Sequence, residues 1–365
     1  MGMWRLIFGT MIVLSVLGIL YLGFAGARFG GIKKLSRGRR LIGVLISLGI
    51  TGALFLIFKL TMSTVNAVMI MLQAVLFFLL FGLVFRIAKR VRKKETKYYW
   101  QGWLAIGVTA VYLSAGWFLC HHVWRTDYSL TTQKQVGQLR AALIADSHIG
   151  ATFDGEGFAE HIKTIAAQSP DILFIAGDFV DNGSKPEDVE RACEALGELD
   201  LKYGVWYCYG NHDDSYSRGK DTSLETLLTE NGIHILSDSS RLIDDRFYVI
   251  GRRDRSQQGR REIKDLISGL DTSKYMIVLD HQPADYDAEA AAGADLVLSG
   301  HTHGGQLIPA TFVGEWLGMN DNTYGYERRS DTDFIVTSGI ADWEIKFKTG
   351  TKSEYVIIEI GNAVA

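Results

Sequence analysis

Four long apolar runs within the first 120 residues constrain the fold of this chain more than any other feature of its sequence. They extend over Trp4 to Phe24, Leu41 to Leu60, Val65 to Phe85 and Trp103 to Cys120. Each has about the 20 residues that a helix needs to cross the hydrocarbon core of a bilayer, and none contains an acidic residue. We therefore predict four transmembrane helices within residues 1–120.

The first apolar run also has features of a cleaved signal peptide. Arg5 lies near its start, and Ala25-Gly26-Ala27 at its end resembles a cleavage site made of small residues. The length of the run and the three further runs favour a retained membrane helix over this alternative.

The distribution of charge predicts how these helices are oriented. Residues 1–126 carry a formal charge of +15 and the rest of the chain −18. The positive charge lies mainly in the linkers after the first and third runs, and Lys and Arg in short loops favour the cytoplasm. We therefore expect the segment after residue 120 to lie outside the cytoplasm. Because that segment is acidic, we expect no binding to nucleic acid.

The pattern of apolar and polar residues changes at about residue 138, after a polar connector that we assign to residues 121–137. Short apolar strands then alternate with amphipathic segments, which is typical of a layered α/β fold. The later strands Leu242 to Ile250, Phe334 to Ser338 and Tyr355 to Ile360 have no helix between them and predict a second sheet packed on the first. This region is assigned to one domain over residues 138–361.

Polar side chains follow five of the predicted strands, where ligands bind in open α/β sheets. The strands concerned are Ala141 to Ala145, Ile172 to Ala176, Val205 to Tyr209, Met276 to Leu279 and Leu296 to Leu298. The motifs after them are Asp146-Ser-His148, Gly177-Asp178-Phe-Val-Asp181, Gly210-Asn211-His212-Asp213, Asp280-His281 and Gly300-His301-Thr-His303. Carboxylates, imidazoles and an amide suit Mn, Fe or Zn. We predict that the five strand ends converge on one sheet edge and bind two divalent ions there.

These motifs, in this order and spacing, resemble the calcineurin-like metallophosphoesterases. The resemblance covers about residues 138–361, and the segment from Gly300 to Gln306 looks most like a bacterial membrane-associated branch with relatives of UDP-2,3-diacylglucosamine pyrophosphatase. It implies a four-layer α/β fold, a β-sandwich flanked by helices. The four apolar runs lie outside it.

The resemblance also implies a role for each motif residue. Asp146, His148 and His303 would hold one ion, Asn211, His281 and His301 the other, and Asp178 would bridge them. The two ions would activate a water molecule for in-line attack on phosphorus. His212 would stabilise the transition state and could in addition protonate the leaving group, and Asp213 would orient His212. Asp181 would support the ligands without binding a metal.

Two further groups of residues leave alternatives open. The run Arg252-Arg253-Asp254-Arg255 either approaches an anionic substrate or forms a solvated turn. Of the three cysteines, Cys193 and Cys208 fall in a predicted helix and a predicted core strand, which favours buried free thiols. A bridge between these two remains an alternative in an oxidising compartment.

The sequence therefore predicts a multi-pass phosphoesterase of a bacterial cell membrane, with its catalytic domain extracytoplasmic. Tethering near the bilayer favours a phosphate ester, diester or pyrophosphate substrate that is lipid-linked or part of the cell envelope, with membrane lipids as neighbours. The alternative hypothesis is a membrane sensor that uses the same domain to bind a ligand without turnover.

Overall fold

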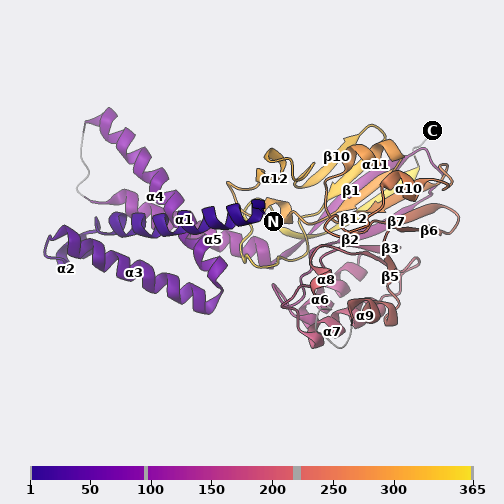
Figure 1. Ribbon diagram of the computed structural model, residues 1–365, viewed down its shortest axis with the longest axis horizontal. Helices are drawn as coiled ribbons and strands as arrows, with labels where there is room; N and C mark the ends of the chain where they lie inside the picture. Colours follow the sequence, from indigo (N-terminus) through magenta and orange to yellow (C-terminus); the bar gives the residue numbers. More distant parts are fainter. Residues whose placement is uncertain (1, 94–97, 217–222, 363–365) are drawn as a thin grey trace. The chain divides into compact units, whose positions relative to one another are not determined.

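The structure is a computed structural model that describes residues 2–93, 98–216 and 223–362. The chain divides into two compact units, Met1–Gly116 and Trp117–Ala365 (Figure 1). Lys94, Glu95 and Lys97, which belong to the second basic linker of the sequence, lie outside the described residues.

Apolar helices make up the first unit, as the sequence predicts. They are α1 (Gly2–Gly26), the short α2 (Gly30–Leu35), α3 (Arg40–Thr61), α4 (Thr64–Arg92) and α5 (Trp100–His121), whose last turn belongs to the second unit. Among the described residues, α3, α4 and α5 are long and apolar enough to cross a membrane, and Val13–Gly26 of α1 forms a shorter apolar stretch. Three or four apolar helices thus precede the second unit, which marks the chain as a membrane protein.

Two six-stranded sheets form the centre of the second unit. The first sheet has the strand order β1 (Val123–Thr132), β12 (Ser353–Asn362), β2 (Leu139–Ile144), β3 (Ile172–Ala176), β4 (Val205–Cys208) and β5 (His234–Leu236). The second has the order β10 (Gly325–Arg329), β11 (Thr332–Val336), β9 (Leu296–Ser299), β8 (Tyr275–Leu279), β7 (Phe247–Gly251) and β6 (Ser239–Ile243). Strands β2, β3 and β4 run parallel in one sheet, and β7, β8 and β9 run parallel in the other.

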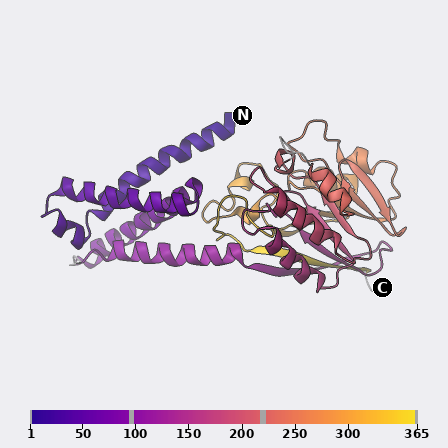
Figure 2. The same ribbon diagram turned by 90° about the horizontal axis from the view of Figure 1, so that it is seen from below.

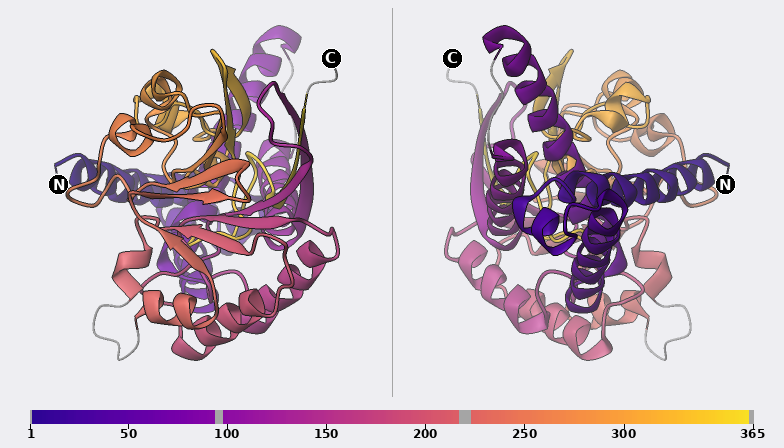
Figure 3. Two further views of the ribbon diagram at one scale, coloured as in Figure 1. Left: turned by 90° about the vertical axis from the view of Figure 1, so that its right-hand side faces the viewer. Right: turned by 90° about the vertical axis from the view of Figure 1, so that its left-hand side faces the viewer.

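Helices cover the outer faces of both sheets. On the first sheet lie α6 (Gly155–Ala166), α7 (Pro186–Gly197) and α9 (Leu224–Glu230); α10 (Ile263–Ile267) and α11 (Tyr286–Ala292) lie on the second. Figure 2 shows the first set in front of the strands, and the left panel of Figure 3 shows the sheets between the two sets. The remaining helical turns are α8 (Asp213–Tyr216), η1 (His303–Gly305) and α12 (Val313–Trp316).

The buried core lies in three clusters, one between the sheets and one under each set of helices. Alternate residues of a strand serve different clusters: in β2, Ala141 and Leu143 face the other sheet, and Ala142 and Ile144 face the helices. Because both faces of the central strands are covered, these strands are continuously apolar, as parallel buried strands are. The predicted four-layer α/β fold is confirmed.

Three details differ from the sequence prediction. The predicted strand Leu242 to Ile250 is a hairpin, β6 and β7, because Asp244 and Asp245 adopt positive φ and turn the chain. Residues 123–132 of the predicted connector form β1, which pairs with β12 in parallel. The five strand ends come from two sheets rather than one, since β2, β3 and β4 belong to the first and β8 and β9 to the second.

The three cysteines are buried and unpaired in the described part of the chain. Cys193 packs under the helices and Cys208 between the sheets, so the first sheet separates them. Burial raises the pKa of the Cys193 thiol to about 12 and that of Cys208 well above its usual value.

We predict that no thiol of the native protein reacts with Ellman's reagent at pH 8, because a buried thiol forms little thiolate there. After unfolding in guanidinium without reductant, all three thiols per chain should react. A count of one thiol after unfolding would instead establish a disulfide, and peptide mapping would show whether it joins Cys193 and Cys208.

Candidate metal centre

Residues that follow five strands meet at the ends of the two sheets. Asp146 and His148 follow β2, Asp178 follows β3 and Asn211 follows β4, whereas His281 follows β8 and His301 and His303 follow β9. The structure brings six of them into two groups: Asp146, His148 and His303, and Asp178, His281 and His301. Within each group the possible ligand atoms all lie within 4.8 Å of one another.

Unusual backbone conformations aim these side chains. Asp146, His148, Asp178, His301 and His303 all have positive φ, between 37° and 71°. Such φ values are uncommon for residues with a Cβ, and they cluster at functional sites because surrounding structure must hold them. Sharp turns at the strand ends therefore direct the side chains toward one place.

Two glycines allow the turns to pack closely. A Cβ on Gly177, which has a φ of +80°, would lie 2.7 Å from the backbone nitrogen of Gly210 and 2.7 Å from Nδ1 of His281. A Cβ on Gly300 would lie 2.5 Å from Oδ2 of Asp146. Both positions touch the candidate ligands directly, so a larger residue at either one would displace them.

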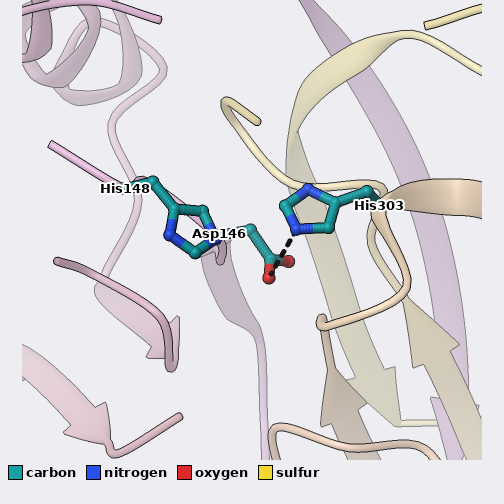
Figure 4. Close-up of side chains that lie close together, drawn as sticks. All are labelled: Asp146, His148 and His303. Atoms are coloured by element: carbon teal, nitrogen blue, oxygen red, sulfur yellow. Dashed lines mark ion pairs between the residues drawn. The ribbon is translucent and has the colours of Figure 1, made fainter. Parts of the chain in front are cut away.

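In the first group, the three side chains point toward one another (Figure 4). Nε2 of His303 lies 3.7 Å from Oδ1 of Asp146, and the rings of His148 and His303 are stacked with centroids 5.3 Å apart. The backbone N–H of His301 donates to both carboxylate oxygens of Asp146, at 3.1 and 2.9 Å. The two motifs after β2 and β9, in different sheets, are thereby held together.

In the second group, Asp178 stands between the two sets of histidines. Its Oδ2 lies 3.1 Å from Nε2 of His281 and 3.8 Å from Nε2 of His148. Nδ1 of His281 must carry a proton, because it donates to the backbone oxygen of Ala176 at 2.7 Å. This hydrogen bond turns Nε2 toward Asp178, the orientation that ligating histidines generally receive from a backbone partner.

The donors of this site fit divalent metal ions. Both ring nitrogens of His148 and Oδ1 of Asn211 are buried without a hydrogen-bond partner among the described residues, an arrangement that costs free energy unless something binds there. Burial lowers the pKa of His148 well below its usual value and that of His301 to about 3, which favours the neutral imidazole that binds metals. At His281 and His303, burial lowers the pKa too, but the neighbouring carboxylates of Asp178 and Asp146 outweigh it and raise the pKa. Together with the resemblance of the motifs to metallophosphoesterases, the two groups indicate a dinuclear site for divalent metals.

Asp213 organises the turns around this site. Its carboxylate accepts hydrogen bonds from the backbone N–H groups of Asp178, Phe179, Val180 and Gly210, at 2.7 to 3.1 Å. Burial and the neighbouring Asp178 raise the pKa of Asp213 to about 7, although the backbone donors oppose this rise. The orientation of His212 by Asp213 stays a prediction.

His212 lies beside both groups. Its backbone N–H donates to Oδ1 of Asp178 at 2.8 Å, and its ring centroid lies 5.0 Å from that of His148. The other candidate supporting residue, Asp181, has Oδ2 3.8 Å from Nδ1 of His148. Both residues therefore adjoin the first group.

Asp342 is a residue of this site that the sequence analysis missed. Its Oδ1 lies 3.0 Å from Nδ1 of His303, while its Oδ2 lies 3.4 Å from Nζ of the buried Lys348 and accepts from Sγ of Cys120 at 3.1 Å. Asp342 lies in a loop without a strand-end motif, so no local pattern marks it. The only signal in the sequence was an unusual density of charged and aromatic residues from position 342 to 348.

Arg252 neither lies in a solvated turn nor is free to approach an anionic substrate. Its guanidinium is 2% exposed and lies within 3.2 Å of carboxylate oxygens of Asp280, Asp285 and Glu289. It thus compensates three acidic groups inside the domain. Of its neighbours in the run, Asp254 is also buried, and Arg255 begins the turn after β7.

The two-sheet α/β sandwich thus carries, at its strand ends, two clusters of aspartate and histidine that could each hold a metal ion. Residues 139–305 match the family model described as calcineurin-like phosphoesterase. An uncharacterized metallophosphoesterase of Aquifex aeolicus is 32% identical over 195 residues, which are 51% of this chain and 71% of the relative. The chain belongs to the calcineurin-like metallophosphoesterase family.

Two further relatives extend this comparison. An uncharacterized metallophosphoesterase of Campylobacter jejuni is 29% identical over 228 residues, covering 61% of this chain and 59% of the relative. A protein of Danio rerio named transmembrane protein with metallophosphoesterase domain is 29% identical over 240 residues, covering 62% and 54%. The chain thus spans little more than half the length of these two relatives. The narrower resemblance to UDP-2,3-diacylglucosamine pyrophosphatase relatives stays a prediction.

We predict that Asp342→Asn weakens binding of the first metal ion about 10- to 100-fold, the effect typical of losing a carboxylate partner of a ligating histidine. The loss of charge makes the His303 imidazole a poorer ligand. Calorimetric titration of the metal-free protein with Mn²⁺ measures the change.

The matched control for this substitution is Asp331→Asn, in the exposed turn between β10 and β11. It should bind Mn²⁺ like the unmodified protein. Equal Mn²⁺ affinity in both variants, with circular dichroism showing a native fold, would show that Asp342 does not support metal binding.

Proposed function

We propose that this protein is a membrane-anchored phosphoesterase that depends on two divalent metal ions, of Mn, Fe or Zn, and hydrolyses a phosphate ester, diester or pyrophosphate bond. Membership of the family implies a phosphoesterase hydrolase. The observation that carries the proposal is the place of Asp178, whose Oδ2 faces a histidine of each group, at 3.1 and 3.8 Å. A carboxylate in that position is suited to bridge two ions.

In this proposal each motif residue keeps the role that the resemblance gives it. Asp146, His148 and His303 would hold one ion, Asn211, His281 and His301 would hold the other, and Asp178 would be shared between them. Two such ions, when bound, offset charge on the phosphoryl oxygens and lower the pKa of a water molecule.

The chain's own residues supply orientation and a proton. Asp213 fixes the backbone of the turn that carries Asp178 through its hydrogen bonds to three consecutive N–H groups. His212, tied to Asp178 by its backbone N–H, presents its ring beside the first group and is the candidate donor of a proton to the leaving oxygen. General acid catalysis by a histidine typically contributes about 10²- to 10⁴-fold in rate.

The substrate in this proposal is lipid-linked or part of the cell envelope. Basic linkers after the first and third apolar runs favour an orientation with the catalytic domain outside the cytoplasm of a bacterial cell. Bacterial relatives include those of Campylobacter jejuni and Aquifex aeolicus. A domain joined directly to a membrane helix acts close to the bilayer, where phosphate esters of lipids are concentrated.

A second candidate function is a sensor that binds a ligand without turnover. It is favoured by the contact of Cys120, in the last turn of α5, with Asp342, which in turn contacts His303. A change in the occupancy of the first group would reach the end of that helix through only two side chains.

We predict that the full-length protein in detergent micelles, loaded with Mn²⁺, hydrolyses at least one of two probes, p-nitrophenyl phosphate and bis-p-nitrophenyl phosphate. Asp178→Asn should abolish turnover because it removes the shared carboxylate. His212→Asn should lower kcat about 10²- to 10⁴-fold while leaving the Mn²⁺ content unchanged.

Asp331→Asn is again the control, and it should keep full activity. Bound Mn²⁺ without turnover of either probe, or of phospholipids added to the micelles, would count against the enzyme and in favour of the sensor. A rate equal to that of the unmodified protein in Asp178→Asn would exclude this metal centre as the catalytic site.

A further inference from the structure

An exposed apolar loop follows the metal-centre histidines. Residues 307–319 lie in the connection between η1 and β10, include α12, and contain a single charged residue, Glu315. Trp316 is 75% exposed, Leu317 60% and Phe312 51%. Isolated exposed apolar residues are ordinary, but a contiguous patch of large ones marks an interaction surface.

The two aromatic rings of this loop lie close to each other. The centroids of Phe312 and Trp316 lie 6.5 Å apart, and Leu317 follows directly in the chain. The patch is therefore formed by one turn of helix and its flanks, which extend outward from the domain at the position of α12 in Figure 1.

Hydrogen bonds attach the start of this loop to the segment 345–349. Nε2 of Gln306 donates to the backbone oxygens of Ile345 and Phe347, at 3.2 and 2.8 Å. The backbone N–H of Ile308 donates to Oγ1 of Thr349 at 3.1 Å. The loop and this segment thus form one end of the domain.

The same end of the domain receives the last turn of α5. The ring of Phe347 lies 6.1 Å from that of Trp117, and the backbone oxygen of Cys120 accepts from Oγ of Ser353 at 2.7 Å. Because α5 is long and apolar enough to cross a membrane, its last turn marks where the chain leaves the bilayer. The loop and the last turn of α5 therefore lie at the same end of the domain.

We propose that the loop 307–319 docks on the bilayer, with Phe312, Trp316 and Leu317 inserted at the level of the head groups and upper acyl chains. Tryptophan prefers this interface, and apolar segments bind it in proportion to the apolar area that they bury. A loop with one charged residue can form few ion pairs with an acidic or basic protein surface. Its continuity with the membrane helix favours lipid as the occupant.

Docking would hold the metal centre beside the lipid head groups. His303 lies four residues before the loop's first turn of apolar residues, and His301 precedes it on the same segment. This consequence, that a head-group phosphate reaches the metal ions, rests on the proposed function; the docking itself does not.

The test measures the depth of the loop in the membrane. Leu317→Cys, labelled with the fluorophore NBD, is prepared in the full-length protein in phosphatidylcholine vesicles; the native cysteines are buried. We expect lipids with a nitroxide on carbon 5 of the acyl chain to quench the label strongly and aqueous iodide to quench it weakly. Phe312→Cys serves as a second labelled variant.

The matched control is Leu242→Cys on β6, which is also exposed and lies at the other end of the domain in Figure 1. It should be quenched by iodide and not by the nitroxide lipids. Iodide quenching of both loop labels at the level of this control would overturn the proposal. Protection of the loop labels from both quenchers would also overturn it, since protein would then cover the patch. Neither quenching measurement requires turnover, so the docking proposal can fail or hold independently of the proposed enzymatic function.

Discussion

The metal centre depends on sharp backbone turns that the two sheets hold in place. Five of the seven candidate ligands have positive φ, and such conformations cost about 1–3 kcal/mol each. Their sum, on the order of 5–15 kcal/mol, is comparable to the net stability of a whole domain. Only a core that fixes every strand end can sustain it. The four-layer sandwich supplies that core, since its central strands are buried on both faces.

The strands and the candidate ligands could be predicted from sequence because their signals are local. A short apolar run that ends in a polar motif identifies β3 and Asp178, or β9 and His301, without knowledge of the rest of the chain. The partition of the strands between two sheets could not be predicted, because pairing depends on contacts between distant segments. The hairpin of β6 and β7 was missed because Asp244 to Arg246 form a tight turn inside an otherwise apolar stretch.

Residues that act through long-range contacts also could not be predicted from the sequence. Asp342 lies 39 positions after His303 and carries no motif, and its value to the site comes from three partners: His303, Lys348 and Cys120. Arg252 looked like a surface cation because its neighbours are charged, yet three carboxylates make its burial tolerable. A buried charge is stable only with such partners, which a single sequence does not reveal.

The same electrostatics would make bound metal ions part of the stability of this domain. Asp146 and Asp178 are buried within the two groups, and burial raises the pKa of Asp146, which is the sign of a carboxylate short of compensation. Divalent cations supply that compensation only where the ligands are assembled, so they bind the folded state in preference to the unfolded one. At a free concentration 100 times the dissociation constant, one such ion stabilises the folded state by about 2.7 kcal/mol. Binding energy of this size offsets part of the cost of the turns, so the fold and the ions support each other.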